Sequence, residues 1–338
     1  MTAHSSPFRV DVETVADGVQ VYLLRDERAG SSARVVPGLG NNLISFQVGL
    51  AGRSQALETI YFPSTGDGVK KTAVFAGNPI LFPYPNRVRD GQYTFEGTTR
   101  DLRSLGRNGY VIHGFVFEAP WQVAEASTDG GARLVSTLRW EDMPSVQEPY
   151  PFPFLLTVAY TLVGAMLRMQ AWVLNTGRRR LPMGFGIHPY FRLPLAEGGR
   201  RQDCLVRVPA SKQWELDANL LPTGRVVPVP PDRDYRRPHR LGEQTLDDVY
   251  TDLEREASWS ECQLMDPAAA VRLKVRADEA FREWVVYAPP DQPTICFEPY
   301  TAPTDAINLQ NRGIDAGLVV LEPREEWTGI VEFIVEPV

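Results

Sequence analysis

Cysteine is scarce in this 338-residue chain: only Cys204, Cys262 and Cys296 occur, far apart in the sequence and odd in number. No two of them form a CxxC pair. A disulfide framework needs paired cysteines and a structural zinc site needs closely spaced ones, so both are disfavoured. The scarcity is typical of a reducing compartment, and we expect a cytoplasmic protein.

Long apolar runs and a strong excess of one charge are lacking as well. No stretch approaches the roughly 18 uncharged apolar residues that span a bilayer. The N-terminal MTAHSSPFRVDVETV has no basic segment followed by an apolar run, as a secretory signal would. Thirty-five basic and 42 acidic residues leave a net charge of −7, which disfavours a surface for nucleic-acid phosphate or anionic lipid. We therefore expect no membrane and no nucleic-acid partner.

Helical periodicity is weak, and alternation with period two takes its place. The best short helical candidate, Arg53–Tyr61, is a poor one, and no GxGxxG motif follows a strand-like segment, which disfavours a dinucleotide-binding fold. Val271, Leu273 and Val275 alternate with charged residues, as on a strand with one buried face. The same alternation recurs over 19–23, 134–140, 167–173 and 331–335. With 27 glycines, 28 prolines and no convincing linker, we expect an all-β protein of antiparallel sheets in a single domain over 1–338.

The clearest irregular stretch is 221–242, LPTGRVVPVPPDRDYRRPHRLG, which is rich in proline and arginine. A loop of this length within a compact domain is usually functional or disordered. Two interpretations stay open at this stage: a rim or lid over a site, and a surface excursion.

Histidine is informative because only four occur. His113 in VIHGF and His188 in GIHPYF lie in similar apolar, glycine-marked surroundings, whereas His4 is near the terminus and His239 lies in the arginine-rich stretch. A structural role is open to each of the first two. Their similar settings favour a shared site.

His188 and Glu298 each precede a proline, which restricts the backbone at both residues to extended conformations. Apolar segments precede both, and a carboxylate in such surroundings is costly unless it is paired or hydrogen-bonded. Desolvation would raise its pKa towards the range of a general base. A glutamate base and a histidine acid across a cavity would make a proton-transfer pair. An ordinary ion pair of Glu298 at a strand end is the alternative.

A third segment ends in Asn86 and Arg87. Three prolines in NPILFPYPNR stiffen the approach to these two residues, and Asp90-Gly91 predicts a turn into a strand. Amide and guanidinium donors at the end of a rigid loop suit the recognition of hydroxyls or of an oxyanion. A connecting turn with solvated arginines is the alternative.

Taken together, these segments resemble the aldose 1-epimerase (galactose mutarotase) family. The motifs are NPILFPYPNRVRDGQYTFEG (78–97), IHGF (112–115), GFGIHPYFRLP (184–194), LPTG (221–224), TLDDVY (245–250) and CFEPYTAPTDAIN (296–308). They follow the family's order and cover most of the chain from about residue 30 onward. The resemblance implies a large antiparallel β-sandwich, the galactose mutarotase-like supersandwich. It also implies interconversion of the α and β anomers of a free monosaccharide, without cofactor or metal. We expect a monomer or a homodimer.

The resemblance also implies catalytic roles for two residues. Glu298 would be the general base that takes the proton from the C1 hydroxyl, and His188 would be the acid that protonates the ring oxygen. The ring would then open, rotate about C1–C2 and close on the other face, with the proton transfers reversed.

Substrate-binding roles follow from the same resemblance. Arg87 and His113 match positions that hold the ring oxygen and neighbouring hydroxyls, and Asn86 beside them is a further candidate for binding hydroxyls. Asp247 matches an aspartate that binds sugar hydroxyls, with a register uncertain by one because Asp248 is adjacent. Four aromatic residues in the motifs either face the sugar ring or belong to the core: Phe82, Tyr190, Phe191 and Tyr300.

The substrate stays open because the motifs are mixed. The HGF form around His113 is reminiscent of hexose-6-phosphate mutarotases, whereas HPYF looks more like the enzymes of free sugars. Arginines converging at one end of the pocket would favour a phosphate; the candidates are Arg89, Arg103, Arg107, Arg236 and Arg237. A carbohydrate-binding protein that catalyses no reaction is another alternative, but it would need neither an acid nor a base. A glycoside hydrolase using Glu298 with Asp247 would leave the histidine without a role.

Overall fold

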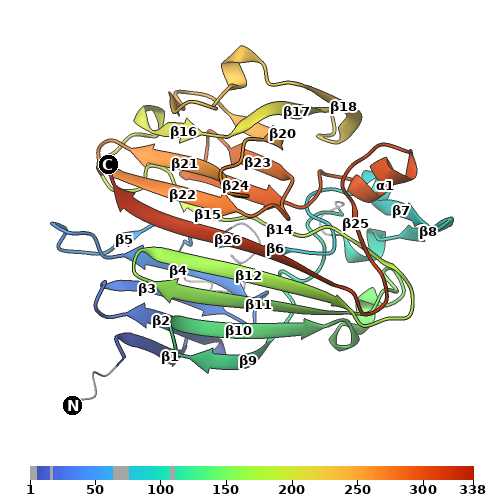
Figure 1. The fold of residues 1–338 in the computed structure, drawn as a ribbon, viewed down its shortest axis with the longest axis horizontal. Coiled ribbons are helices and arrows are strands. Elements are labelled where there is room, and N and C mark those ends of the chain that lie inside the picture. Colours follow the sequence, from blue (N-terminus) through green and yellow to red (C-terminus); the bar gives the residue numbers. More distant parts are fainter. Residues whose placement is uncertain (1–5, 16–17, 64–75, 107–110) are drawn as a thin grey trace.

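The computed structural model describes residues 6–15, 18–63, 76–106 and 111–338, and most of its regular structure is antiparallel β-strand (Figure 1). The described part contains one α-helix, α1 (Ala306–Asn311), and no helix long and apolar enough to cross a membrane. The all-β prediction is confirmed. The helical candidate Arg53–Tyr61 is wrong, because this segment carries the short strand β5 (Leu57–Glu58) instead.

The largest sheet has nine strands. In spatial order they are β19 (His239–Arg240), β16 (Leu205–Arg207), β21 (Ser260–Asp266), β22 (Val271–Ala277), β26 (Glu326–Pro337), β12 (Met166–Asn175), β11 (Phe154–Val163), β10 (Ala132–Arg139) and β9 (Gln122–Ser127). Burial alternates strictly along β22, where Val271, Leu273 and Val275 are buried. The segments with predicted alternation at 134–140, 167–173 and 331–335 fall on β10, β12 and β26, apart from the last residue of the first.

Two further sheets complete the sandwich. The eight-stranded sheet runs β18 (Pro222–Pro228), β17 (Ala210–Leu216), β20 (Leu246–Leu253), β23 (Glu283–Ala288), β24 (Thr294–Tyr300), β14 (Gly186–Ile187) and β6 (Ile80–Leu81), and β15 (Tyr190–Arg192) also pairs with β24. The five-stranded sheet runs β1 (Phe8–Thr14), β2 (Gln20–Asp26), β3 (Ser31–Val36), β4 (Asn42–Val48) and β5. Two small ribbons pair β7 (Gln92–Phe95) with β8 (Thr98–Asp101) and β13 (Leu181–Met183) with β25 (Val319–Leu321). The 3-10 turn η3 (Arg89–Gly91) leads into β7, as the Asp90-Gly91 turn predicts.

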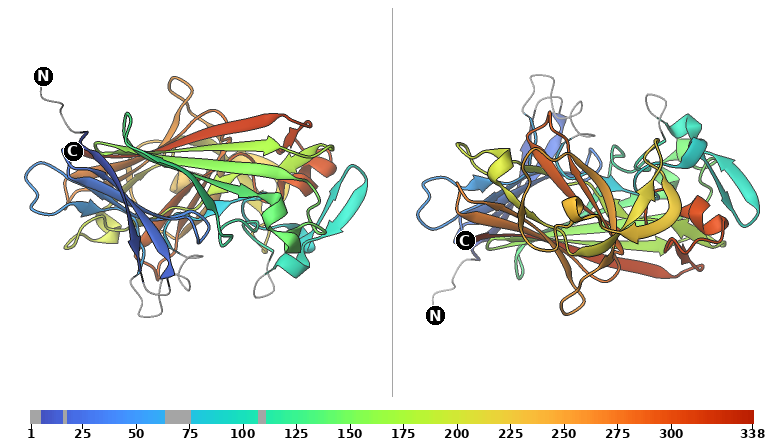
Figure 2. Two further views of the ribbon diagram at one scale, coloured as in Figure 1. Left: turned by 90° about the horizontal axis from the view of Figure 1, so that it is seen from below. Right: turned by 90° about the horizontal axis from the view of Figure 1, so that it is seen from above.

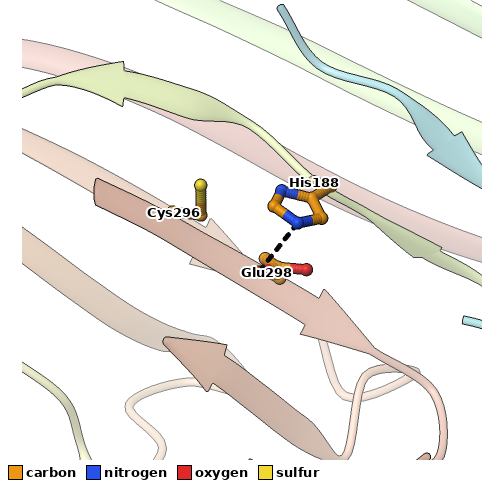
Figure 3. A group of neighbouring side chains, drawn as sticks. All are labelled: His188, Cys296 and Glu298. Carbon is orange, nitrogen blue, oxygen red and sulfur yellow. Dashed lines mark ion pairs between the residues drawn. The ribbon is translucent and has the colours of Figure 1, made fainter. Parts of the chain in front are cut away.

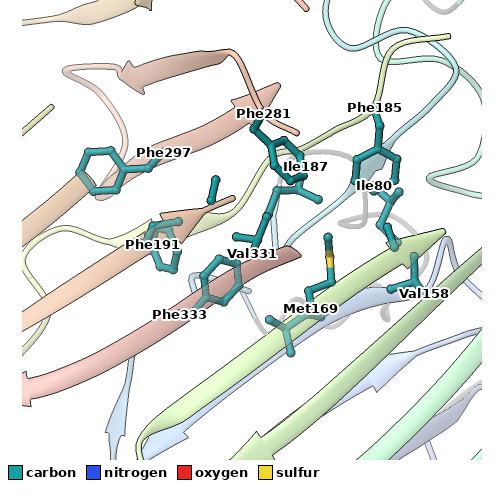
Figure 4. Close-up of a cluster of buried hydrophobic side chains, with 14 of the residues drawn as sticks. Ile80, Val158, Met169, Phe185, Ile187, Phe191, Phe281, Phe297, Val331 and Phe333 are labelled. Carbon is teal, nitrogen blue, oxygen red and sulfur yellow. The ribbon is translucent and has the colours of Figure 1, made fainter. Parts of the chain in front are cut away.

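Both smaller sheets pack on the nine-stranded one. Strands β1 and β2 lie against β10 and β11 (Figures 1 and 2). Further along the same sheet, the ring of Phe191 in β15 meets that of Phe333 in β26 edge to face, with centroids 5.3 Å apart. Ile187 and Phe297 belong to the same buried cluster (Figure 4). One face of β14, β15 and β24 is therefore fixed by the core, and side chains of the other parity point away from it.

The stretch 221–242 is more regular than its composition predicts. It contains the edge strand β18 of the eight-stranded sheet, the turn η8 (Pro231–Arg233) and the edge strand β19 of the nine-stranded sheet. The expectation of a single irregular loop is thus wrong. The segment connects the edges of two sheets, and His239 is exposed on the second.

Candidate active site

The site forms where the pairing along one edge of β24 is interrupted. β15 pairs with β24 at Tyr190 opposite Cys296, and β14 pairs with β24 in the same register beyond the gap. His188 and Glu298 lie opposite each other in the gap, midway between the Tyr190–Cys296 pair and the Gly186–Tyr300 pair. A proline follows each of these residues, and neither proline has an N–H to donate to the ladder. The His188 N–H instead donates to the Pro79 carbonyl, 3.0 Å away on the opposite side.

His188 and Glu298 are in contact (Figure 3). The Nε2 atom of His188 lies 3.4 Å from Oε1 of Glu298, while the Tyr300 hydroxyl donates to Oε2 at 2.5 Å. The Tyr190 ring stacks on the His188 ring with centroids 4.5 Å apart and an interplanar angle of 9°. Only 1% of Glu298 and 8% of His188 is exposed. The His188 ring is thus held in place by packing, and Glu298 by packing and by the Tyr300 hydrogen bond.

Burial governs the electrostatics of this pair. It raises the pKa of Glu298 well above 4.5, opposed by the Tyr300 hydrogen bond and reinforced by the charge of Asp247. It also lowers the pKa of His188 from 6.5 to about 3. The neutral forms of both groups are favoured, because an isolated charge is costly here. One proton held between the two groups can move from one to the other within their contact.

A loop holds His113 beside this pair. The rings of His113 and His188 meet edge to face, with centroids 5.3 Å apart. The His113 N–H donates to the Asn86 carbonyl at 2.9 Å, and the Asn86 N–H donates to Nδ1 of His113 at 3.3 Å. Nδ1 is therefore the acceptor, which places the ring proton of neutral His113 on Nε2. Both residues have left-handed backbones, with φ of 60° for Asn86 and 66° for His113, a conformation that non-glycine residues rarely adopt outside turns and functional sites.

Arg87 and Asp247 complete the charge of the site. Nη1 of Arg87 donates to Oδ1 of Asn86 at 3.1 Å. Burial raises the pKa of Asp247, and the positive charge of Arg87 opposes that rise. Burial chiefly lowers the pKa of His113, and the positive charge of Arg87 adds to this, so the guanidinium lies within electrostatic reach of both His113 and Asp247. The structure therefore brings Asn86, Arg87, His113, His188, Asp247 and Glu298 together.

Strand register distinguishes the two neighbouring aspartates. Asp247 pairs with Tyr287, which pairs with Cys296, so these three share the face of β24 that carries Glu298. Asp248 has the other parity, and its Oδ2 lies 3.5 Å from the Arg233 guanidinium. Of the two, Asp247 lies on the face of the site.

Two residues of this face were not predicted to touch the catalytic pair: Cys296 had no predicted role, and Tyr300 was a candidate only for the sugar ring or the core. Tyr300 and Cys296 lie two residues on either side of Glu298, and the alternation along TICFEPY is the sequence signal that could have placed them there. Tyr300 needs Gly186 opposite it, because a Cβ at Gly186 would lie 2.5 Å from Cδ1 of the tyrosine ring. Cys296 has a free, buried thiol.

The motif aromatics divide between core and site. Phe82 and Phe191 are fully buried in the main hydrophobic core. Tyr190 stacks on His188, and Tyr300, which also belongs to a second buried cluster, donates to Glu298. The two tyrosines are thus the ones available to the site.

The candidate arginines that the structure describes divide between two cavities. Arg89 and Arg103 line a cavity of about 540 Å³ together with Arg87, but they pair with Asp217 and Asp101. Arg236 and Arg237 line a different cavity, in the segment after β18. Arg107 lies outside the described residues.

Comparison of the sequence with protein-family models identifies the family to which this site belongs. Residues 20–333 match the model of the aldose 1-epimerase family. The chain belongs to this family. The resemblance carried by the motifs is thereby confirmed over nearly the whole sequence of this aldose 1-epimerase family member.

Individual relatives agree on the fold. A galactose mutarotase-like protein from Clostridium acetobutylicum superposes with a TM-score of 0.86 at 20% identity, covering 99% of this chain and 100% of the other. A galactose 1-epimerase from Lactobacillus acidophilus gives a TM-score of 0.77 at 20% identity, over 98% and 99%. In sequence, the uncharacterized protein YihR of Escherichia coli is 26% identical over 250 residues, 72% of this chain and 74% of its own. The predicted galactose mutarotase-like β-sandwich is confirmed.

Proposed function

We propose that this family member interconverts the α and β anomers of a free hexose by opening and closing the sugar ring. The observation that carries the proposal is the contact between two buried groups of opposite chemistry, His188 between β14 and β15 and Glu298 on β24. Ring opening requires a proton to leave the C1 hydroxyl and another to reach the ring oxygen. An acid and a base on the same face meet both requirements.

The pair carries one mobile proton. When it resides on His188, Glu298 is the carboxylate that accepts the C1 hydroxyl proton, and the imidazolium donates to the ring oxygen. The C1–O5 bond breaks, the aldehyde forms, and rotation about C1–C2 presents its other face. Closure returns both protons. The Tyr300 hydroxyl stabilises the carboxylate form through its hydrogen bond, so the reactive state is accessible despite burial.

The neighbouring polar groups suit the rest of the sugar. Arg87 and His113 supply N–H donors for the ring oxygen and adjacent hydroxyls, with the Asn86 amide beside them. Asp247 supplies an acceptor from β20 on the same face. A free hexose is favoured over a hexose 6-phosphate because, of the described candidate arginines, Arg89 and Arg103 are paired with aspartates and the other two line a different cavity.

Polarimetry on freshly dissolved α-anomers of glucose, galactose and other aldoses tests the proposal, after subtraction of the uncatalysed drift. Glu298→Gln and His188→Asn should each lower turnover by more than about 100-fold, since a positioned acid or base contributes typically 10²–10⁴-fold. Glu283→Gln is the matched control, because Glu283 is equally buried on the adjacent strand but does not contact His188 in the described structure. Near-normal turnover in either site variant would refute the mechanism. Activity on hexose 6-phosphates alone would refute a free hexose as the substrate but leave the proposed reaction in place.

A further inference from the structure

A thiol lies beside the proton-transfer pair and takes no part in the chemistry proposed for it. Cys296 is two residues from Glu298 on β24 and shares its face, next to His188 (Figure 3). All three side chains are buried, and the thiol is not in a disulfide. Sulfur, imidazole nitrogen and carboxylate oxygen therefore converge in one place.

The separations are close to those of a metal site. One donor atom from each residue lies within 4.8 Å of the other two, and the measured Nε2–Oε1 separation is 3.4 Å. Ligand atoms at neighbouring corners of a tetrahedral zinc site lie about 3.3–3.6 Å apart, as follows from zinc–nitrogen and zinc–oxygen lengths near 2.0–2.2 Å and a zinc–sulfur length near 2.3 Å. The nitrogen–oxygen edge has this length already, and the sulfur needs to move by at most about 1.3 Å to reach it.

The donors are also available and selective. Nδ1 of His188 is buried and has no hydrogen-bond partner among the described residues, so the ring is held by its contacts with neighbouring rings and with Glu298. A thiolate, an imidazole and one carboxylate suit Zn²⁺ or Cd²⁺, while Mg²⁺ and Ca²⁺ require more oxygen ligands. The carboxylate of Asp247 is close enough to influence both Cys296 and Glu298, which adds negative charge around a cation.

We propose that His188, Cys296 and Glu298 form a binding site for a borderline-soft divalent cation such as Zn²⁺, and that its occupation inhibits the enzyme. The inhibition rests on the proposed function, because the cation takes up the lone pairs of both the acid and the base. The binding of the cation does not depend on the proposed function. Three protein ligands leave a fourth position for water or a substrate hydroxyl.

Binding is tested without reference to activity by titrating the full chain with Cd²⁺ and following the thiolate-to-metal absorption band in the ultraviolet. Wild type should show a saturable band at one Cd²⁺ per chain. Cys296→Ser and Cys296→Ala should abolish it, and Glu298→Gln should weaken binding by about 10-fold or more. Cys262→Ser is the matched control, since Cys262 is equally buried on a strand of the other large sheet, and its band should be unchanged. Thermal unfolding of each variant verifies that it is folded.

Inhibition is tested by polarimetry with Zn²⁺, with Mg²⁺ and Ca²⁺ as comparisons. Zn²⁺ should inhibit wild type, and the concentration for half inhibition should rise at least about 10-fold in Cys296→Ser, whose rate without metal should be retained. A band that persists in both Cys296 variants, or the lack of a saturable band in wild type, would overturn the site. Equal inhibition of wild type and Cys296→Ser would overturn the inhibitory role. A chain without activity on any sugar would refute the proposed function, while the Cd²⁺ titration would still decide the site.

Discussion

Replacing Glu283 with glutamine should stabilise the protein at neutral and alkaline pH. Glu283 lies on β23 directly opposite Tyr300, and only 1% of it is exposed. Its Oε2 has no hydrogen-bond partner among the described residues. Burial, the largest cause, raises its pKa from 4.5 to about 8. At pH 7 the folded protein therefore keeps a proton on this side chain that the unfolded chain has lost.

The sign and size of the effect follow from proton linkage. Between pH 4.5 and about 8 the folded state binds more protons at Glu283 than the unfolded state does, so the stability contributed by this group falls as the pH rises. The fall is complete above the folded pKa. A displacement of about 3.5 pH units at 1.36 kcal/mol per unit amounts to at most about 5 kcal/mol. Glutamine has the same shape and no charge to desolvate, so the variant should escape this loss.

Urea unfolding of wild type and Glu283→Gln at pH 5, 7 and 9 measures the difference. The two curves should nearly coincide at pH 5, and the variant should become more stable by several kcal/mol at pH 9. Glu322→Gln, at an exposed position, is the control and should follow wild type throughout. If the gap between Glu283→Gln and wild type grows by less than about 1 kcal/mol from pH 5 to pH 9, the assigned burial effect is refuted.

Two further predictions concern the site itself. Tyr300→Phe removes a hydrogen bond to the Glu298 carboxylate, so the pKa of Glu298 should rise further and the acid limb of kcat/KM should move to higher pH, with activity at neutral pH lowered roughly 10-fold; a polarimetric pH profile identical to wild type would contradict this role. Asp247→Asn should raise KM for the sugar, whereas Asp248→Asn, on the opposite face beside Arg233, should leave KM unchanged. Equal effects of the two substitutions on KM would show that the register does not govern binding.

Much of the fold could be predicted from local patterns, because alternation with period two records which side of each strand faces the core. The segment 221–242 was misjudged for a related reason. Its prolines resemble loop punctuation, yet Pro222 and Pro228 are the end residues of an edge strand, where a missing N–H is tolerated. Composition alone cannot distinguish these two settings.

The candidate site depends on information that local patterns lack. Alternation shows that Asp247 and Asp248 point to opposite faces, but only the pairing of three strands shows which face holds Glu298. The contact between His188 and Glu298 likewise depends on pairing between strands that are about 110 residues apart in sequence. The resemblance to the family's motifs identified His188 and Glu298 as candidates. Their separation and the Tyr300 hydrogen bond required the structure.

The proposed catalytic groups and several of the proposed sugar-binding groups come from different parts of the fold around the interruption in β24. His188 lies between β14 and β15 and Glu298 lies on β24, so the pairing of both short strands with β24 sets their separation. Asn86, Arg87 and His113 come instead from irregular segments that lie against this sheet. Under the proposed function, changes in those segments should alter which sugar is accepted while the relative positions of His188 and Glu298 are kept. The framework would then fix the proposed acid and base and leave the surrounding loops free to diverge.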